Sequence, residues 1–367
     1  MNKRWLRRMD FTLIGATATI IVMSLIVISS ATHINTAGGD HYWFVQKQAV
    51  FVVLNVLFAI FLMNFDYKAL QSYGRNLYIF NVVMLLLVML IGQTALGAQR
   101  WIQLGPITLQ PSEFSKIIMI IALAAMLEDR VGKLNSLSDI LPVVGYVGLP
   151  FILVLKQPDL GTSLVFIAIL LGMMFVAGVN LRILAAFFAA GVAASPLLWL
   201  ILKDYQKMRL KVFLDPSVDP LGSGYHIIQS KIAIGSGLIF GKGLFGGTQS
   251  QLNFLPENHT DFIFAVVGEE LGFVGAAVLL LLYLVVLWRG VKIARDASDT
   301  FGRLLAVGIT SMLAFHVLVN VGMTTGIMPV TGIPLPLMSY GVSSLTTNMI
   351  AITILLNIHM RKTKLLF

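Results

Sequence analysis

The chain has 367 residues, of which 57% are apolar and only 12% are charged. Soluble globular domains carry about 25% charged residues, so this composition excludes an ordinary soluble protein and indicates a membrane protein with several spans. The absence of cysteine excludes disulfides and thiolate metal sites, and the formal net charge of +9 has to be explained from the positions of the basic residues.

Ten apolar stretches run along the chain, each long enough, or nearly so, to cross about 30 Å of hydrocarbon. They lie at residues 11–32, 44–64, 77–96, 113–127, 140–155, 160–179, 182–202, 261–288, 303–323 and 342–360. We therefore expect an all-α membrane protein of about ten transmembrane helices that forms one domain over residues 1–367. The first stretch ends at Thr32 and His33, a poor context for signal cleavage, and is expected to remain as a span.

If the N-terminus is placed in the cytoplasm, most lysine and arginine residues fall in the segments on the cytoplasmic side. Because cytoplasmic loops carry the excess of basic residues, we expect both termini inside the cell. The long polar loop at residues 203–260, between the seventh and eighth spans, then faces outward. The net charge is thus a signal of membrane topology, and no nucleic-acid partner is expected.

The junction between the third and fourth spans carries charges at membrane depth. Pro111 suits the first turn of a helix, so Glu113 and Lys116 lie three residues apart on one helix face and can form an ion pair. This pair is either structural or part of the polar wall of a substrate cleft. Charges at this depth favour the cleft, in which Arg100 and Lys116 would attract an anionic ligand.

Two further polar segments on the outer side have both structural and functional interpretations. Asp159, in the turn KQPDLGTS, can cap the next span by accepting backbone N–H bonds from Gly161 or Thr162, and a cap that faces a cavity can also contact a ligand. Six of the thirteen residues in GSGLIFGKGLFGG, residues 235–247, are glycine. Their amides and Lys242 could bind phosphate, but the pattern is not a P-loop, and ATP is not expected.

The segment LPENHTDFIFAVVGEELG, residues 255–272, places a carboxylate at the edge of a span. Asn258 or Thr260 could cap a helix that begins near Asp261, which would then be a first-turn acid that complements the helix dipole. Alternatively the carboxylate is functional, because a charge at the edge of the bilayer costs free energy. His259 is more typical of a loop histidine than of a metal ligand, and no HxxxH or HExxH pattern is present.

The last polar segment is MPVTGIPLPLMSYGVSS, residues 328–344. Its three prolines deny it a regular helix. Irregular backbone at membrane depth is tolerated only against protein or a cavity, so we expect this segment to form a cavity wall.

In this order, RWIQLG, QPSEFSK, QPDLGTS, LPENHTDFIFAVVGEELG and SYG resemble the SEDS family (shape, elongation, division and sporulation) across essentially the whole chain. The long loop, with IIQSKIAIGSG and GTQSQLNFLPE, and the segment TGIPLP resemble the cell-elongation branch more than the division branch. Two positions depart from the family pattern, because Leu238 and Val342 stand where the family usually has glycine. Neither departure changes a charged residue, so both concern the backbone geometry of two loops.

The resemblance implies a peptidoglycan glycosyltransferase of the bacterial cell membrane. Such an enzyme polymerises lipid II into β-1,4-linked strands on the outer face and releases undecaprenyl diphosphate. The essential loop aspartate of the family corresponds to Asp261, which would act as general base in a single inverting displacement. The implied substrate-binding residues are Arg100, Glu113, Lys116, Asp159, Arg209, Lys231, Lys242, Glu257, His259 and Thr260. The basic residues among them would stabilise the leaving diphosphate, alone or with a Mg²⁺ or Mn²⁺ ion bridged through the phosphates.

The resemblance also implies a partner, a class B penicillin-binding protein with one membrane span. This chain lacks the SxxK, SDN and KTG motifs and so cannot crosslink peptides itself. Two alternative functions are a lipid II flippase and a noncatalytic scaffold for the partner. A flippase needs charged groups along a path through the whole bilayer, whereas the polar residues here gather on the outer side, which favours the enzyme.

Overall fold

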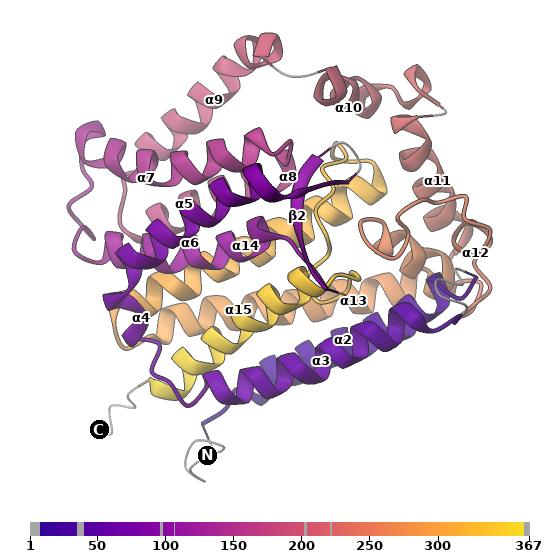
Figure 1. The fold of residues 1–367 in the computed structure, drawn as a ribbon, viewed down its shortest axis with the longest axis horizontal. Helices are drawn as coiled ribbons and strands as arrows, with labels where there is room; N and C mark the ends of the chain where they lie inside the picture. The colour runs from indigo at the N-terminus through magenta and orange to yellow at the C-terminus, as the bar shows by residue number, and fades with distance from the viewer. Residues whose placement is uncertain are drawn as a thin grey trace.

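The computed structural model describes residues 8–34, 40–95, 98–105, 107–201, 204–220 and 222–362, and the chain forms a mostly helical bundle (Figure 1). The ten apolar stretches correspond to helices α2 (Phe11–Ala31), α3 (Trp43–Leu62), α5 (Gly74–Ile91), α6 (Pro111–Glu128), α7 (Leu137–Lys156), α8 (Leu160–Val176), α9 (Leu181–Ile201), α13 (Ile263–Asp296), α14 (Thr300–Thr325) and α15 (Val342–Arg361). A short helix, α4 (Ala69–Ser72), precedes α5.

Seven of these helices, namely α2, α3, α5, α7, α13, α14 and α15, are long and apolar enough to cross a membrane. The protein is therefore a multi-pass membrane protein. Helix α8 has only 17 residues, and α6 carries three charged side chains, Glu113, Lys116 and Glu128. The expected number of about ten spans thus stays a prediction.

Helix α14 lies at the centre of the bundle, where it packs against α13, α8 and α6. It and α15 are largely buried in protein, whereas α3 and α5 expose most of their apolar side chains. Val53, Leu57 and Phe61 on α3 are all more than half exposed. A continuous exposed apolar surface of this kind is typical of contact with lipid.

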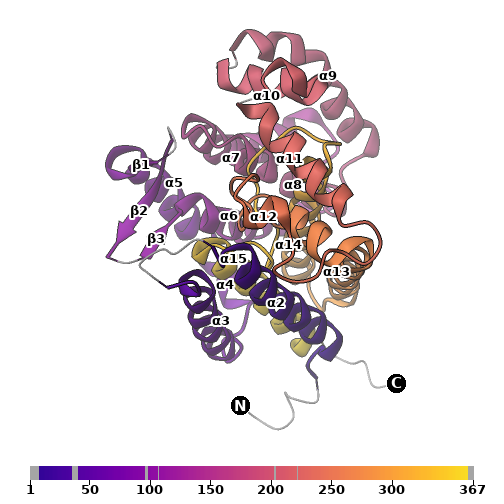
Figure 2. The same cartoon turned by 90° about the vertical axis from the view of Figure 1, so that its right-hand side faces the viewer.

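A small antiparallel sheet connects α5 to α6, so the expectation of an all-α protein is wrong for this junction. Strands β1 (Gln93–Ala95), β2 (Ala98–Leu104) and β3 (Ile107–Leu109) pair in the order β1-β2-β3, with Ile102 opposite Leu109. Gly105 makes the turn between β2 and β3 with φ of 62°, a conformation that favours glycine. Figure 2 shows the sheet at the edge of the bundle.

The expected outer loop is itself helical. It contains α10 (Asp204–Leu214), the 3₁₀ turn η2 (Pro216–Val218), α11 (Ser223–Ser236) and α12 (Thr248–Gln251). Residue 203, at which the loop was expected to begin, lies outside the described residues. Figure 1 shows α10, α11 and α12 at the end of the bundle opposite both termini.

Helix α13 is broken at Gly272, which has φ of 65° and ψ of −163°. The glycine-rich segment that follows α11 fits into this break. Phe273 N donates to Leu238 O at 2.9 Å, and Gly243 N donates to Glu270 O at 3.0 Å. Irregular backbone at this depth therefore has protein partners. The break makes residues 263–271 a separate short helical segment immediately after Asp261.

Candidate active site

The candidate site contains a buried ion pair within α6 that also contacts a histidine of α14. Lys116 Nζ donates to Glu113 Oε1 at 2.7 Å and lies 3.0 Å from His316 Nε2. The three side chains are at most 3% exposed. Pro111 is the first residue of α6, so the predicted i, i+3 pairing is confirmed.

Asp159 caps α8 and also anchors two neighbouring elements. Its Oδ1 accepts from Thr162 N at 3.1 Å, which confirms the predicted cap. Its Oδ2 accepts from Gln110 Nε2 at 3.2 Å. Arg100, on β2, lies 3.8 Å from Asp159 Oδ1 and donates to Gln157 O at 2.9 Å. Arg100 thus holds the sheet against the turn that begins α8.

Asp261 lies in a turn two residues before α13. The interpretation of Asp261 as an acid in the first turn of the helix is therefore wrong. The expected caps also bind elsewhere. Asn258 Nδ2 donates to Ser250 O at 3.0 Å, and Thr260 Oγ1 donates to Glu257 Oε2 at 3.0 Å. Helix α13 begins at Ile263 without a side-chain cap.

The backbone carbonyl of Asp261 accepts a hydrogen bond, whereas its carboxylate accepts none within the described residues. Asn320 Nδ2 donates to Asp261 O at 2.8 Å. Within the part of the chain that the structure describes, no hydrogen bond or ion pair reaches the carboxylate. Gly332 leaves room beside it, because a Cβ there would lie 3.3 Å from Asp261 Oδ2. A substrate hydroxyl could therefore approach this carboxylate.

Burial raises the pKa of Asp261 to about 7, and the charge of Glu257 acts in the same direction. Arg209 and Arg100 oppose this shift, while Asp159 adds to it. Several of the predicted residues therefore lie close enough to affect one carboxylate electrostatically. A carboxylate that titrates near neutrality is suited to accept a proton at physiological pH.

The proline-rich segment closes over the Asp261 turn, as expected for a cavity wall. Ser339 Oγ donates to Thr260 O at 2.6 Å, and Tyr340 N donates to His259 O at 2.9 Å. The His259 ring lies 5.0 Å from the ring of Phe44 and 5.6 Å from that of Tyr340. Burial lowers the pKa of His259, which favours the neutral imidazole.

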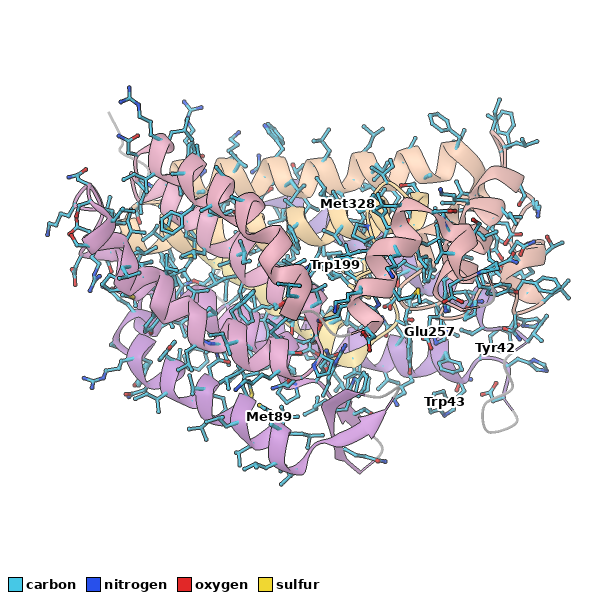
Figure 3. All side chains as sticks on the ribbon, turned by 90° about the horizontal axis from the view of Figure 1, so that it is seen from above. Tyr42, Trp43, Met89, Trp199, Glu257 and Met328 are labelled. Atoms are coloured by element: carbon cyan, nitrogen blue, oxygen red, sulfur yellow. The ribbon has the colours of Figure 1, made fainter. Side chains whose placement is uncertain are left out.

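The remaining predicted residues differ in how available their charges are. Lys242 Nζ pairs with Glu269 Oε1 at 2.9 Å, so its charge is already balanced. Lys231, on α11, is exposed and lies over Gly326, with no ion-pair partner in the described part of the chain. Arg209 is half-buried on α10. Glu257 is exposed, and Figure 3 shows it at the same end of the bundle as Tyr42 and Trp43.

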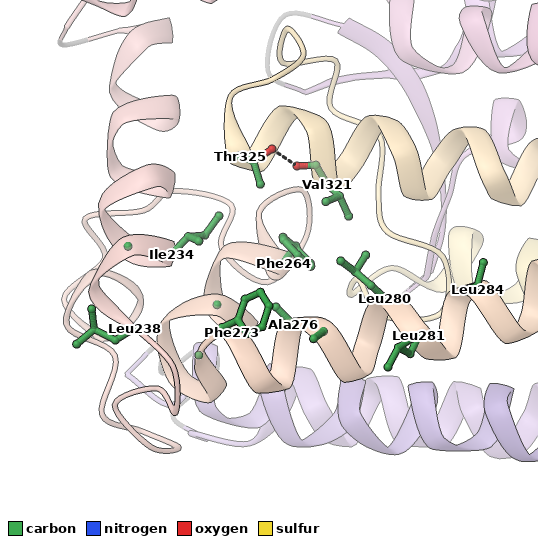
Figure 4. Close-up of a pocket in the computed structure, with 14 residues that line it drawn as sticks. Ile234, Leu238, Phe264, Phe273, Ala276, Leu280, Leu281, Leu284, Val321 and Thr325 are labelled. Carbon is green, nitrogen blue, oxygen red and sulfur yellow. Dashed lines mark hydrogen bonds between the residues drawn. The ribbon is translucent and has the colours of Figure 1, made fainter.

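An apolar groove of about 860 Å³ lies between α11, α13 and α14 (Figure 4). Its lining begins at Phe264, three residues after Asp261, and continues along α13 through Phe273 and Leu281 to Leu284. Phe273 is 71% exposed and Leu281 is 60% exposed. The groove therefore lies along the exposed face of α13.

Among the described residues, no group of three or more His, Asp or Glu side chains is arranged to hold a metal ion.

Comparisons with known proteins decide the family. The sequence model of the FtsW/RodA/SpoVE family of cell cycle proteins matches residues 11–364. The chain belongs to this family. Peptidoglycan glycosyltransferase MrdB of Escherichia coli K12 is 41% identical over 341 residues, which cover 93% of this chain and 92% of MrdB. Stage V sporulation protein E of Bacillus subtilis strain 168 is 39% identical over 355 residues, which cover 95% of this chain and 96% of that protein.

Solved structures agree. A peptidoglycan synthase complex that coordinates polymerization and crosslinking contains a chain that is 33% identical, with a TM-score of 0.82, covering 97% of this chain and 99% of that one. The rod shape determining protein RodA of Thermus thermophilus is 29% identical, with a TM-score of 0.72 and coverage of 97% and 98%. These matches confirm the predicted SEDS membership and the predicted peptidoglycan glycosyltransferase activity at the level of the family.

The two departures from the SEDS pattern have different structural consequences. Leu238 has a positive φ of 49°, a conformation that glycine adopts at less cost. Val342 is the first residue of α15 and is not among the residues with positive φ. Of these two residues, Leu238 is the one that carries backbone strain.

Sequence reasoning missed two site residues of this SEDS protein, His316 and Asn320. Both are polar, both lie inside an apolar span, and both are at most 2% exposed. Buried polar groups in a span require partners, and this signal could have drawn attention to them. Their partners, Lys116 and Asp261, lie far away in the sequence and could not be identified from local patterns.

Proposed function

We propose that this chain polymerises lipid II, with Asp261 as the general base. The observation that carries the proposal is the Asp261 carboxylate, which has no protein donor among the described residues and a pKa of about 7. It would take the proton of the acceptor sugar 4-hydroxyl as this oxygen attacks the anomeric carbon of the donor. The bond from that carbon to undecaprenyl diphosphate then breaks. One inverting displacement converts the α-linked donor into a β-1,4 product.

The leaving diphosphate gains charge that must be stabilised. Lys231 is the most available of the three candidate lysines, because it is exposed and has no ion-pair partner in the described residues. Arg209 and Arg100 act on the same region, since both affect the pKa of Asp261. Lys242 is a weaker candidate because Glu269 already balances its charge. A divalent cation bound with the substrate would add positive charge that helps to stabilise the leaving diphosphate.

The Glu113–Lys116 pair has no net charge, so it would contribute a fixed dipole, without direct contact with the substrate. Lys116 is only 1% exposed, and Glu113 and His316 already lie within hydrogen-bonding distance of its ammonium group. It would therefore act on the substrate through its electrostatic field. Glu257, His259 and Thr260 lie within the turn that leads to Asp261, where they would contact the sugars, and Asp159 would hold Arg100 in place.

The site would face the outside of a bacterial cell membrane. The start of α2 and the end of α15 lie at the end of the bundle opposite α10, α11 and α12, as required if an even number of helices crosses (Figure 1). Ten crossings, including α6, α8 and α9, meet this requirement. The concentration of lysine and arginine in alternate connections then places the termini in the cytoplasm.

We further propose that the single span of a class B penicillin-binding protein packs in the apolar groove. The groove runs along the exposed face of α13, where Phe273 and Leu281 protrude, and reaches α11 of the outer loop. A partner with one span and an external domain would contact both surfaces at once. The chain contains no cysteine, so Leu281→Cys provides a unique crosslinking position. Crosslinking to the partner span would support the proposal, and crosslinking only to lipid would contradict it.

The decisive test compares the wild-type protein with Asp261→Ala, each purified with the partner and supplied with fluorescent lipid II. A matched control is Asp215→Ala, which removes an exposed loop carboxylate that bonds only Ser217. We expect polymer from the wild type and the control and none from Asp261→Ala. Equal polymerisation by all three, or lipid transfer across vesicles without polymer, would refute the enzyme hypothesis in favour of a scaffold or a flippase.

A further inference from the structure

Helix α14 carries three buried polar side chains at a spacing of four residues. His316 is 2% exposed, and Asn320 and Thr324 are fully buried. Residues four apart lie on one face of a helix, so the three form a single polar stripe inside an apolar span. Polar groups at this depth cost free energy unless they are bonded, so their partners indicate what the stripe does.

Asn320 joins the two loops that surround the candidate base. Its Nδ2 donates to Asp261 O at 2.8 Å and to Ile333 O at 2.8 Å. The amide group has two N–H bonds, and both are used to hold these carbonyl oxygens. Ile333 follows Gly332, the residue that leaves room beside the Asp261 carboxylate. One side chain thus fixes both the position of the carboxylate and the wall that faces it.

His316 acts on the other charged group. Its Nε2 lies 3.0 Å from Lys116 Nζ. An ammonium group can only donate hydrogen bonds, so Nε2 must accept, and the ring is neutral with its proton on Nδ1. Lys116 then has two fixed acceptors, His316 Nε2 and Glu113 Oε1. Its ammonium group is therefore held in one place by two different helices.

Thr324 connects the helix to the outer loop through its backbone, because its carbonyl oxygen accepts from Ser230 Oγ of α11 at 2.7 Å, while its hydroxyl donates to Asn320 O of the same helix at 3.0 Å. We propose that His316 and Asn320 are positioning residues that fix the distance between the Lys116 ammonium and the Asp261 carboxylate through one rigid helix. This inference rests on the proposed function of Asp261. A displacement of about 1 Å at a reacting group can lower a rate about 100-fold, so such positioning has a measurable effect.

The test for Asn320 uses Asn320→Leu, which is close in size and lacks both donors, and Asn320→Ser, which keeps one donor and protects against failure to fold. Thr310→Val is the matched control, because Thr310 is a buried polar residue of the same helix that bonds only Ala306 O. Lipid II polymerisation is measured with each variant in complex with its penicillin-binding protein partner, using only preparations that are monodisperse. We expect kcat to fall about 100-fold in the Leu variant, with KM within about threefold, and the control to stay within about twofold of wild type.

Two comparisons keep this test separate from the proposed function. If Asp261→Ala is as active as wild type, the proposed function fails. If Asp261→Ala is inactive while Asn320→Leu and Asn320→Ser stay within about threefold of wild type, only the positioning role fails. Equal losses in kcat and in lipid II affinity would also overturn it, because they indicate a general structural defect rather than a misplaced carboxylate.

The test for His316 compares His316→Gln with His316→Leu. Glutamine can accept a hydrogen bond from Lys116 through its side-chain oxygen, whereas leucine cannot. We expect the Gln variant to keep kcat within about threefold and the Leu variant to lose about tenfold or more, the effect of leaving a buried ammonium one acceptor short. Equal activity of the two variants, whether high or low, would overturn the role of His316 as an acceptor.

Discussion

The Glu113–Lys116 pair allows a sharp prediction, because both side chains are almost fully buried and their charges lie 2.7 Å apart. Removing one partner of such a pair typically costs about 3–5 kcal/mol, since the other charge is left buried and uncompensated. Glu113→Gln belongs at the lower end of this range, because Lys116 keeps His316 and the amide oxygen as acceptors. Lys116→Met belongs at the upper end, because it leaves a carboxylate without a donor.

The double substitution Glu113→Gln with Lys116→Met removes both charges. His316 Nε2 and the neutral amide at position 113 are then left without the lysine donor, whereas Lys116→Met alone leaves the same nitrogen and a charged carboxylate. An unpaired neutral group costs about 1–3 kcal/mol and a charged one costs more. We therefore expect the double variant to be more stable than Lys116→Met alone. The assay is unfolding of the three variants and wild type in mixed detergent and SDS micelles, followed by tryptophan fluorescence. Additive losses, with the double variant least stable, would refute the claim that the two charges stabilise each other.

Three further predictions follow from the site and its surroundings. Because the raised pKa of Asp261 keeps it protonated in acid, activity should be present above about pH 7 and fall about tenfold per pH unit below it; a pH–kcat profile that is flat down to about pH 5 would contradict this. Gly332→Ala adds about 1–2 kcal/mol of backbone strain, because alanine disfavours positive φ, and it places a Cβ 3.3 Å from Asp261 Oδ2. Gly132 has a similar φ but open space around it, so we expect the Gly332→Ala variant to lose more polymerase activity than the Gly132→Ala variant. Leu238→Gly should raise the free energy of unfolding by up to about 1 kcal/mol, measured in the same micelle assay, because glycine removes the strain at φ of 49°.

Local rules were sufficient for features that depend on neighbours in the sequence. Pro111 fixed the start of α6, so the pairing of Glu113 with Lys116 followed from helix geometry alone. The cap at Asp159 was predictable for the same reason, since its donor is Thr162. The apolar stretches became helices because their length and hydropathy leave no other way to satisfy the backbone in a membrane.

Features that depend on distant contacts were not predictable. The sheet at residues 93–109 forms from strands too short to give a clear alternating pattern. Helix α13 begins at Ile263 without a side-chain cap, and Asn258 donates to Ser250 O, a contact that depends on the fold of the loop. The break at Gly272 is filled by a segment about 30 residues earlier, which also explains the glycines there by close backbone packing.

The charge pairing and the pKa values of the site residues likewise could not be predicted without the fold. Lys242 was expected near phosphate from its glycine-rich surroundings, but in the structure Glu269 balances its charge. Asp261 was identified from the resemblance, while its elevated pKa depends on burial and on Glu257 in the folded turn. The site residues stay a prediction, and the fold shows which of their charges already have partners.

The most direct test of the central claim is the turnover of Asp261→Asn with lipid II in the complex with its partner. Asparagine keeps the shape and removes the base, and the variant should fold well because the carboxylate makes no hydrogen bond within the described residues. A general base contributes about 10²- to 10⁴-fold to the rate. We expect kcat to fall at least about 100-fold while lipid II binding changes less than about threefold. Polymerisation within about threefold of wild type would contradict the assignment of Asp261 as the base.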